Sequence, residues 1–262
     1  MNLDLNGRHA LVCGGSQGIG RAAAIELAQL GASITLLARS QATLDATLDD
    51  LPRTHAAQAH ACVAVDMSDH AALRAAVDTV ANRTPVQILI NNTGGPPGGP
   101  AHAAKVEEYI SAFNQHLIAN QIVLQAVLPG MRAAAYGRVI NVISTSVKEP
   151  IKNLGVSNTI RGAVASWAKT LAGELGAFGI TVNNVLPGYT KTQRLQQILG
   201  DRARATGQDE DAIAKAMLGS VPAGRFAEAG EIGAVIAFLA SPAAGYVNGI
   251  NVPVDGGRMQ SL

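Results

Sequence analysis

Apolar runs of strand length alternate with amphipathic segments of helix length from one end of the chain to the other. The runs are short, rich in β-branched residues and mostly uninterrupted by polar positions, which is typical of strands buried on both faces of a parallel sheet. The expected strands span residues 9–13, 33–38, 62–65, 86–90, 138–142, 181–186 and 250–254. The expected helices span residues 20–30, 41–50, 70–83, 104–134, 157–178, 209–218 and 228–240. This alternation predicts the α/β class and a doubly wound parallel sheet of about seven strands.

These elements use nearly the whole chain, so we expect a single domain over residues 1–262. Two segments stand outside the pattern: a Gly/Pro-rich loop at 93–100 and a longer segment at 191–224. In a doubly wound sheet both would lie beyond the carboxyl ends of strands, where ligands bind. The loop either shapes an access channel or is a surface connector. We expect the region at about 188–225 to face the substrate, although it contains no motif that identifies that substrate.

Composition excludes several classes of protein. Lys and Arg number 20 against 19 Asp and Glu, and no basic run occurs, so nucleic acid is not an expected partner. No apolar stretch approaches the length of a membrane span, and the first residues lack a signal-peptide pattern, which predicts a cytoplasmic protein. The cysteines, Cys13 and Cys62, are expected to be small buried residues, and no metal site is indicated.

A glycine-rich turn follows the first expected strand. Its sequence is Gly14-Gly15-Ser16-Gln17-Gly18-Ile19-Gly20, and a helix is expected to start directly after it. Glycines without a Cβ allow a tight turn in which the backbone N–H groups of the helix start approach a pyrophosphate. The strand, turn and helix together predict a Rossmann-type dinucleotide site, rather than an ordinary turn between a strand and a helix.

The spacing Gly-x-x-x-Gly-x-Gly resembles that of the short-chain dehydrogenase/reductase family. Asn91-Asn92-Thr93-Gly94, Pro187-Gly188 and Val254-Asp255-Gly256-Gly257 extend the resemblance over essentially the whole chain. It implies that Asp66 contacts the adenine, and that Asn91 and Gly94 support the central strand and the adenosine ribose. Pro187-Gly188 and Thr192 would line the carboxamide and pyrophosphate of the cofactor.

The end of the second strand bears on cofactor choice. Ala38 stands where relatives that prefer NAD carry an acidic residue, and Arg39 follows it. A guanidinium forms charge-assisted hydrogen bonds with a 2′-phosphate, so we expect NADP(H) over NAD(H), with NAD as the alternative. Gln17 replaces a second basic residue found in many relatives, which makes the preference modest. Arg39 could also be an ordinary solvated surface cation.

The catalytic positions depart from the family. Its active members use a Tyr-x-x-x-Lys pair on one helical face, in which the ammonium lowers the pKa of the phenol. None of the four tyrosines here, at positions 109, 136, 189 and 246, has a lysine four residues later. Alignment retains the family serine as Ser144. Ser157 falls at the tyrosine position, Arg161 at the lysine position and His116 at the asparagine position, with Asn114 and Asn120 close by.

The substitutes suggest a rebuilt proton relay. Arg161 can hold the cofactor ribose or stabilise an oxyanion, but it does not release its proton at neutral pH. Ser157 is a weak acid. Lys148 and His116 are therefore the candidate proton-transfer groups, and their alternatives are a solvent-exposed loop lysine and a core histidine.

Three functions fit these residues. The first is an oxidoreductase that moves hydride between NADP(H) and a carbonyl or secondary alcohol. The second is a catalytically silent nucleotide-binding protein, such as a regulatory subunit. The third, a lyase similar to halohydrin dehalogenases, fits worst because those relatives keep the tyrosine and lose the glycine-rich loop. The resemblance also implies a homotetramer, or a dimer, assembled through the alanine-rich segments 104–134 and 157–178.

Overall fold

The computed structural model describes residues 1–261 and contains one seven-stranded sheet. The strand order is β3-β2-β1-β4-β5-β6-β7, and every neighbouring pair is parallel. The strands are β1 His9–Cys13, β2 Ser33–Ala38, β3 Ala61–Ala64, β4 Ile88–Asn91, β5 Gly137–Val142, β6 Ile180–Pro187 and β7 Asn251–Val254. Strand order reverses between β1 and β4, which creates a switch point at the carboxyl edge of the sheet. The predicted class and topology are confirmed.

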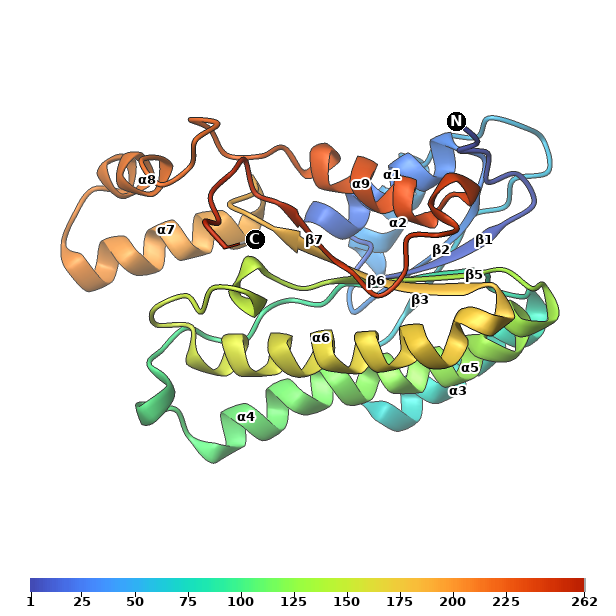
Figure 1. Cartoon of the computed structure of the whole chain (residues 1–262), viewed down its shortest axis with the longest axis horizontal. Coiled ribbons are helices and arrows are strands. Elements are labelled where there is room, and N and C mark those ends of the chain that lie inside the picture. The colour runs from blue at the N-terminus through green and yellow to red at the C-terminus, as the bar shows by residue number, and fades with distance from the viewer. Residues whose placement is uncertain (262) are drawn as a thin grey trace.

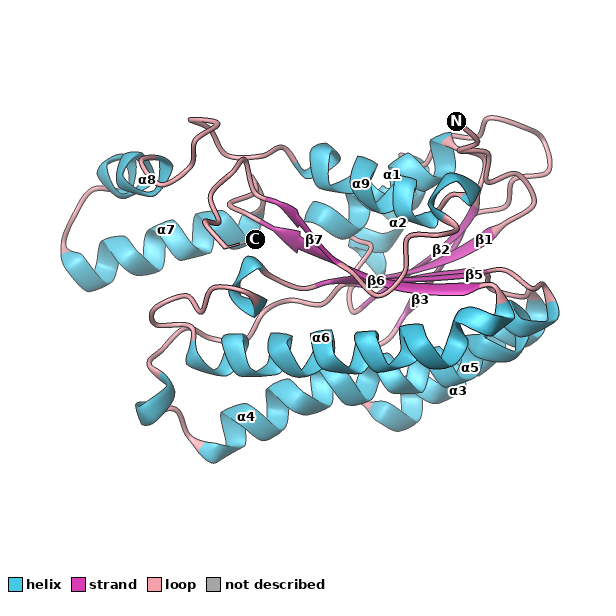
Figure 2. Cartoon of the chain, in the orientation of Figure 1, coloured by secondary structure: helices cyan, strands magenta, loops and turns pink. Residues whose placement is uncertain are grey.

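Helices cover both faces of this sheet (Figures 1 and 2). Their bounds are α1 Gly18–Gln29, α2 Gln41–Asp49, α3 His70–Arg83, α4 Val106–Phe113, α5 Ala119–Ala133, α6 Gly155–Leu175, α7 Gln193–Thr206, α8 Glu210–Leu218 and α9 Ala229–Ala240. Short 3₁₀ turns lie at Ala101–Ala103, Thr145–Val147, Gly176–Phe178 and Pro242–Ala244. None of the helices within residues 1–261 is long and apolar enough to cross a membrane.

The pleat of the strands divides the core into two layers. Ala10 and Val12 of β1 pack in one cluster with α1, α2 and α9, whereas Leu11 and Cys13 pack in the other with α3, α5 and α6. Successive side chains of a strand point to opposite faces, so an uninterrupted apolar strand supplies both clusters. The same two layers are visible above and below the sheet in Figure 1.

A row of asparagines crosses the carboxyl half of the sheet. Asn91 donates to the side-chain oxygen of Asn141, Asn141 to that of Asn184, and Asn184 to that of Asn251, at 2.8 to 2.9 Å. These residues face one another in the registers of β4, β5, β6 and β7. Because each buried amide finds a partner on the next strand, the row joins the strands that support the site.

The expected helix over 104–134 is present as one uninterrupted helical run, in which a π-helical stretch, Asn114–Ile118, joins α4 to α5. Two other local predictions were wrong. The segment 191–224 contains an unpredicted helix, α7. Cys62 is only half-buried, because β3 is an edge strand with partly exposed residues, and its Sγ lies 3.3 Å from the Gln41 amide. Cys13 is fully buried, as predicted.

Candidate active site

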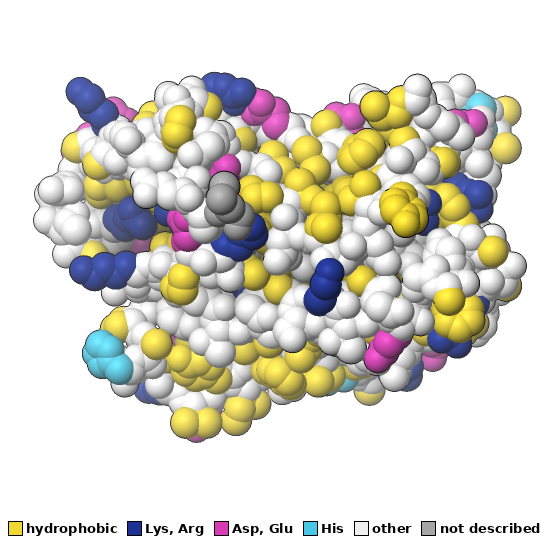
Figure 3. Space-filling model, in the orientation of Figure 1, with side chains coloured by type: hydrophobic (Ala, Val, Ile, Leu, Met, Phe, Trp, Pro, Cys, Tyr) yellow, Lys and Arg dark blue, Asp and Glu magenta, His cyan; other side chains and the backbone are white. Residues whose placement is uncertain are grey.

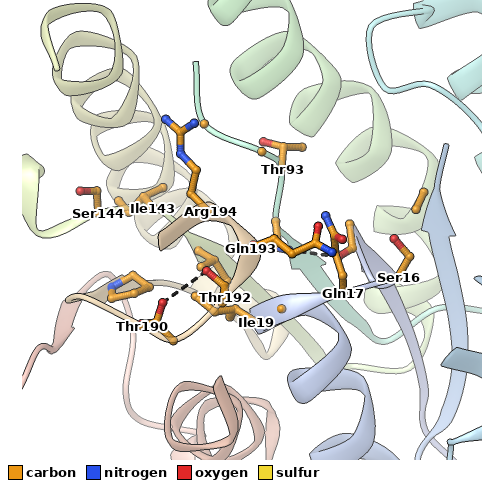
Figure 4. Close-up of a pocket in the computed structure, with 18 of the residues that line it drawn as sticks. Ser16, Gln17, Ile19, Thr93, Ile143, Ser144, Thr190, Thr192, Gln193 and Arg194 are labelled. Atoms are coloured by element: carbon orange, nitrogen blue, oxygen red, sulfur yellow. Dashed lines mark hydrogen bonds between the residues drawn. The ribbon is translucent and has the colours of Figure 1, made fainter. Parts of the chain in front are cut away.

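A cavity of about 520 Å³ opens at the carboxyl edge of the sheet. Its walls come from the turn between β1 and α1, from the segments that follow β2, β3, β4, β5 and β6, and from the first turn of α7 (Figure 4). This is the edge where the parallel-sheet pattern placed a ligand. The loop at 93–100 contributes Thr93, Gly94 and Gly95 to the wall, so its first part does more than connect elements at the surface.

The glycine-rich turn has the backbone expected of an anion cradle. Gly14 and Gly18 lie in the left-handed region, with φ of 61° and 56°. A Cβ on Gly14 would collide with the carbonyl of Asn92, and one on Gly20 with the carbonyl of Gly14. Helix α1 begins at Gly18, and its N-cap residue Gln17 makes no side-chain capping bond. The N–H groups of the first turn are therefore available to a phosphate.

Most residues expected at the cofactor meet in this cavity. Those that line it are Gly14, Ser16, Gln17, Gly18, Ile19, Arg39, Asp66, Gly94, Pro187, Gly188 and Thr192. The two others expected there, Gly20 and Asn91, lie behind the wall. Gly20 allows the close approach within the turn, and Asn91 belongs to the asparagine row.

Arg39 and Asp66 stand together at the outer rim. Asp66 accepts hydrogen bonds from the backbone N–H and the hydroxyl of Ser68, at 2.8 and 2.7 Å. These bonds hold the pKa of the Asp66 carboxyl below its ordinary value, and the charge of nearby Arg39 acts in the same direction. The rim therefore offers one carboxylate and one guanidinium at neutral pH.

Ser144, Ser157 and Arg161 share the opposite part of the cavity. The hydroxyl of Ser144 accepts from the backbone N–H of Ser146 at 3.0 Å, which leaves its proton for another acceptor. Ser157 and Arg161 are four residues apart on α6, so they share one face of that helix.

Arg161 is buried, with 8 % of its surface exposed. Its guanidinium donates to the backbone carbonyl of Val142 at 3.1 Å and to that of Thr93 at 3.4 Å. Burial lowers the pKa of Arg161 to about 10, and the charge of Arg194 contributes. The group remains a cation at neutral pH.

His116 lies behind this wall rather than in it. The π-helical stretch turns its ring inward, where it is 1 % exposed and its Nδ1 lies 2.5 Å from the hydroxyl oxygen of Thr93. Burial, helped by the charge of Arg161, lowers the pKa of His116 to about 3, so the ring is neutral at pH 7. Its Nε2 has no hydrogen-bond partner in the described part of the chain. Thr93, which lines the cavity, is the link between His116 and that space.

Lys148 lies outside the wall of the cavity. It follows the 3₁₀ turn Thr145–Val147, and it is half-buried.

The tyrosines offer little to replace the missing phenol. Tyr136 donates to the carbonyl of Ala240 inside the core, Tyr109 lies near the carbonyl of Ala101, and Tyr246 is fully exposed. Of the four tyrosines, all within residues 1–261, Tyr189 is the one that lines the cavity. Its ring packs edge-on against Phe226, at a centroid distance of 6.1 Å, and beneath the guanidinium of Arg258.

Among the residues of the wall to which the sequence assigned no role are Thr93 and Arg194. Arg194 stands in the first turn of α7 and donates to the carbonyl of Pro96 at 3.0 Å. Figure 4 shows its side chain extending from the helix toward the segment that carries Thr93. The apolar positions Leu195, Ile198 and Leu199 have helical spacing, and this signal would have predicted α7 and so placed Arg194 beside Thr192.

Comparison with known proteins agrees with this geometry. A family model described as enoyl-(acyl carrier protein) reductase matches residues 14–258. The chain is 32% identical to the 3-oxoacyl-[acyl-carrier-protein] reductase of Pseudomonas aeruginosa, over 99% of this chain and 100% of the relative. The crystal structure of L-sorbose reductase from Gluconobacter frateurii, complexed with NADPH and L-sorbose, matches at 28% identity with a TM-score of 0.93 and covers all of both chains.

A structure of NAD⁺-bound xylitol dehydrogenase also matches, at 27% identity with a TM-score of 0.89, over 97% of this chain and 99% of that one. The matches extend along the whole sheet and include both the glycine-rich turn and the segment after β6. The chain belongs to the short-chain dehydrogenase/reductase family of oxidoreductases.

Proposed function

We propose that this protein is an NADP(H)-dependent oxidoreductase acting on a carbonyl or a secondary alcohol, with a proton relay that does not use a Tyr-x-x-x-Lys pair. One observation carries the proposal: a single cavity joins the glycine cradle and Arg39 to Ser144 and Arg161. A dinucleotide site and a polar site for a carbonyl oxygen therefore adjoin.

The residues present fit a nicotinamide dinucleotide. Left-handed Gly14 and Gly18 open the backbone at the start of α1, where a pyrophosphate binds. Arg39 would bind a 2′-phosphate, which favours NADP(H), in line with the NADPH in the sorbose reductase complex. NAD remains the alternative because Asp66 stands close by and the xylitol dehydrogenase match holds NAD⁺.

At the other end of the cavity, Ser144 and Arg161 would bind the reacting oxygen. A bound nicotinamide supplies or accepts the hydride. The Ser144 hydroxyl would donate to the substrate oxygen, since its own oxygen already accepts from Ser146. The fixed charge of Arg161 would stabilise negative charge on that oxygen during reduction.

Proton transfer has three candidate groups. Ser157 lines the cavity but is a weak acid. His116 would act through Thr93: a neutral ring with its proton on Nδ1 would donate to the Thr93 oxygen and orient the hydroxyl proton of Thr93 toward an acceptor in the cavity. Because the pKa of His116 is lowered to about 3, the ring would position this hydroxyl, and the transferred proton would be replaced from solvent. Lys148 lies outside the wall of the cavity. Thr93 and Ser157 are therefore the hydroxyl groups of this set that face the cavity.

A catalytically silent dinucleotide-binding protein is the second candidate. The observation that favours it is that none of the four tyrosines has a lysine four residues later, and that Tyr189, the tyrosine in the wall, packs its ring against Phe226 and Arg258.

Fluorescence titration with NADPH, followed by a panel of carbonyls and alcohols read at the nicotinamide absorbance, separates the candidates. Micromolar binding with turnover on the panel is expected. NADPH binding without turnover of any compound would favour the catalytically silent protein. The absence of NADPH binding would contradict both candidates and would favour the lyase considered from the sequence.

We also propose a homotetramer, with a dimer as the alternative. Helix α4 carries Val106, Ile110 and Phe113 at helical spacing, and they are 67%, 55% and 39% exposed. Figure 3 shows apolar side chains gathered over the region of α4 and α6. A second copy covering this stripe would bury it. Light scattering should give four chains, and Ile110→Glu should give fewer. A cytoplasmic location stays a prediction from the sequence.

A further inference from the structure

Two arginines lie close together at the substrate end of the cavity, which is the end that holds Ser144 and Ser157. Arg161 comes from α6 and Arg194 from the first turn of α7, and both line the wall. A Cβ on Gly95 would lie 3.8 Å from a terminal nitrogen of Arg194 and 3.9 Å from one of Arg161. Both guanidinium groups therefore lie close to the same glycine, and their terminal nitrogens are at most about 8 Å apart, the sum of these two distances.

Within residues 1–261, no carboxylate forms an ion pair with either arginine. Ion pairs in this part of the chain involve Arg21, Lys191, Arg204 and Arg225 instead. Among the described residues, the hydrogen bonds of Arg161 and Arg194 go to the backbone carbonyls of Val142, Thr93 and Pro96. Asp66, the acidic residue in the wall, stands at the rim with Arg39, at the end of β3.

The burial of Arg161 next to a second guanidinium costs free energy. Burying a charge without an opposite charge costs free energy, and two like charges repel. Each guanidinium has five N–H donors, and the carbonyls engage only some of them. An anion placed between the groups would offset the cost and occupy the remaining donors.

We propose that Arg161 and Arg194 bind a carboxylate of the substrate, so that the substrate is an oxo acid or the corresponding hydroxy acid. The inference rests on the proposed oxidoreductase function and names its substrate class. A carboxylate is planar and matches the planar donor fork of a guanidinium, and two arginines can hold its two oxygens. Ser144 follows Val142, the carbonyl partner of Arg161, by two residues, so the reacting carbonyl would lie near the carboxylate.

The test is a comparison of acids with their neutral esters. Binding to the full-length protein with saturating NADPH is measured by calorimetry for three pairs: acetoacetate, pyruvate and levulinate, each against its methyl ester. We expect each acid to bind about tenfold more tightly than its ester or better, as for a charge-assisted hydrogen bond. In Arg194→Gln this ratio should fall to about one. Arg194→Lys should retain part of it.

Arg202→Gln is the matched control, because Arg202 lies on the exposed side of the same helix and outside the cavity. It should keep the wild-type ratio. Equal affinity for acids and esters in the wild type would overturn the proposal. Loss of NADPH affinity in Arg194→Gln with an unchanged acid-to-ester ratio would also overturn it, since Arg194 would then serve a cofactor phosphate.

Two further measurements test whether the ligand is a phosphate and whether the anion site depends on the cofactor. Dihydroxyacetone phosphate against dihydroxyacetone tests a phosphate monoester, and a larger ratio there than for the acids would refute the carboxylate. The acid and ester titrations are also repeated with no NADPH added. If the wild type does not bind NADPH, the proposed oxidoreductase function fails. A preference for acids over esters that persists without NADPH, and that Arg194→Gln removes, would still support the anion site.

Discussion

The two ends of the cavity are built from different parts of the chain. At the nucleotide end, the glycine turn presents backbone N–H groups, and a Cβ on Gly14 or Gly20 would collide with a neighbouring carbonyl. At the substrate end, we expect recognition to depend on side chains, and we infer from the sequence that Ser157, Arg161 and His116 replace the residues of the family pattern. Backbone recognition is set by the fold itself, so the nucleotide end tolerates few substitutions. Side-chain chemistry can be exchanged on the same strands and helices, so the reaction can change while the cofactor site stays.

Restoring the family pair tests the substrate end most directly. The double variant Ser157→Tyr with Arg161→Lys places a phenol and an ammonium four residues apart on α6. If proton transfer limits the reaction, turnover of neutral ketones should rise by roughly 10²-fold, the smaller contribution typical of a general acid. Steady-state kcat and NADPH titration are the measurements. Unchanged kcat with intact NADPH binding in the double variant, compared with both single variants, would show that proton transfer is not limiting.

Gly14→Ala tests the nucleotide end. The substitution places a Cβ against the carbonyl of Asn92 at a residue with φ of 61°. NADPH affinity should fall by roughly 10²-fold as the turn shifts, since strain of this kind costs a few kcal/mol. Gly7→Ala is the matched control, with φ of 71° and open space around its Cβ. It should lower the melting temperature slightly and leave NADPH affinity unchanged. Equal NADPH affinities for the two variants would refute the backbone cradle.

Arg39→Ala concerns the basic side chain that we assign to the nucleotide end, where Asp66 is the acidic one. The KM for NADPH should rise about tenfold because a charge-assisted hydrogen bond to the 2′-phosphate is lost, and the KM for NADH should stay the same or fall. Arg53→Ala, an exposed arginine outside the cavity, is the control and should change neither value. If only NADH binding suffers, the preference for NADP(H) is wrong.

The pattern of apolar positions predicted the sheet because it shows which residues are buried and on which faces of a strand they lie. Alternate residues of β1 reach two different cores, and an uninterrupted apolar run is the signature of that. The π-helical stretch at Asn114–Ile118 has no such signature. It adds one residue to a helical turn without changing the apolar pattern much, so the π-helical stretch between α4 and α5 could not be predicted.

The candidate site was predictable where backbone geometry dictates the residue type. Glycines at left-handed positions, such as Gly14 and Gly18, are visible in the sequence. Arg194 was missed because its role depends on distance: it meets Arg161 only after α7 folds back over the loop that holds Pro96. The inward position of His116 likewise depends on the π-helical stretch.

His116 gives the one prediction that concerns stability and leaves binding at neutral pH unchanged. Its pKa is lowered to about 3 in the folded protein, against an ordinary value of 6.5. Between these values the unfolded chain binds a proton that the folded protein does not. The free energy of unfolding should therefore fall as pH decreases from 6.5 toward 3, by up to about 1.4 kcal/mol per pH unit for this ring, and this contribution should be constant above pH 6.5.

Urea denaturation of the wild type and of His116→Gln across this range isolates the ring, because His9 and His60, whose pKa values are also lowered, stay in both proteins. The two curves should run parallel above pH 6.5 and diverge below it, with the wild type showing the steeper loss. If the two curves of unfolding free energy against pH were parallel over the whole range, the His116 ring would bind a proton in the folded protein as readily as in the unfolded chain. His116 would then be charged beside Arg161, and the neutral link through Thr93 to the substrate end would fail, while the nucleotide end would be unaffected.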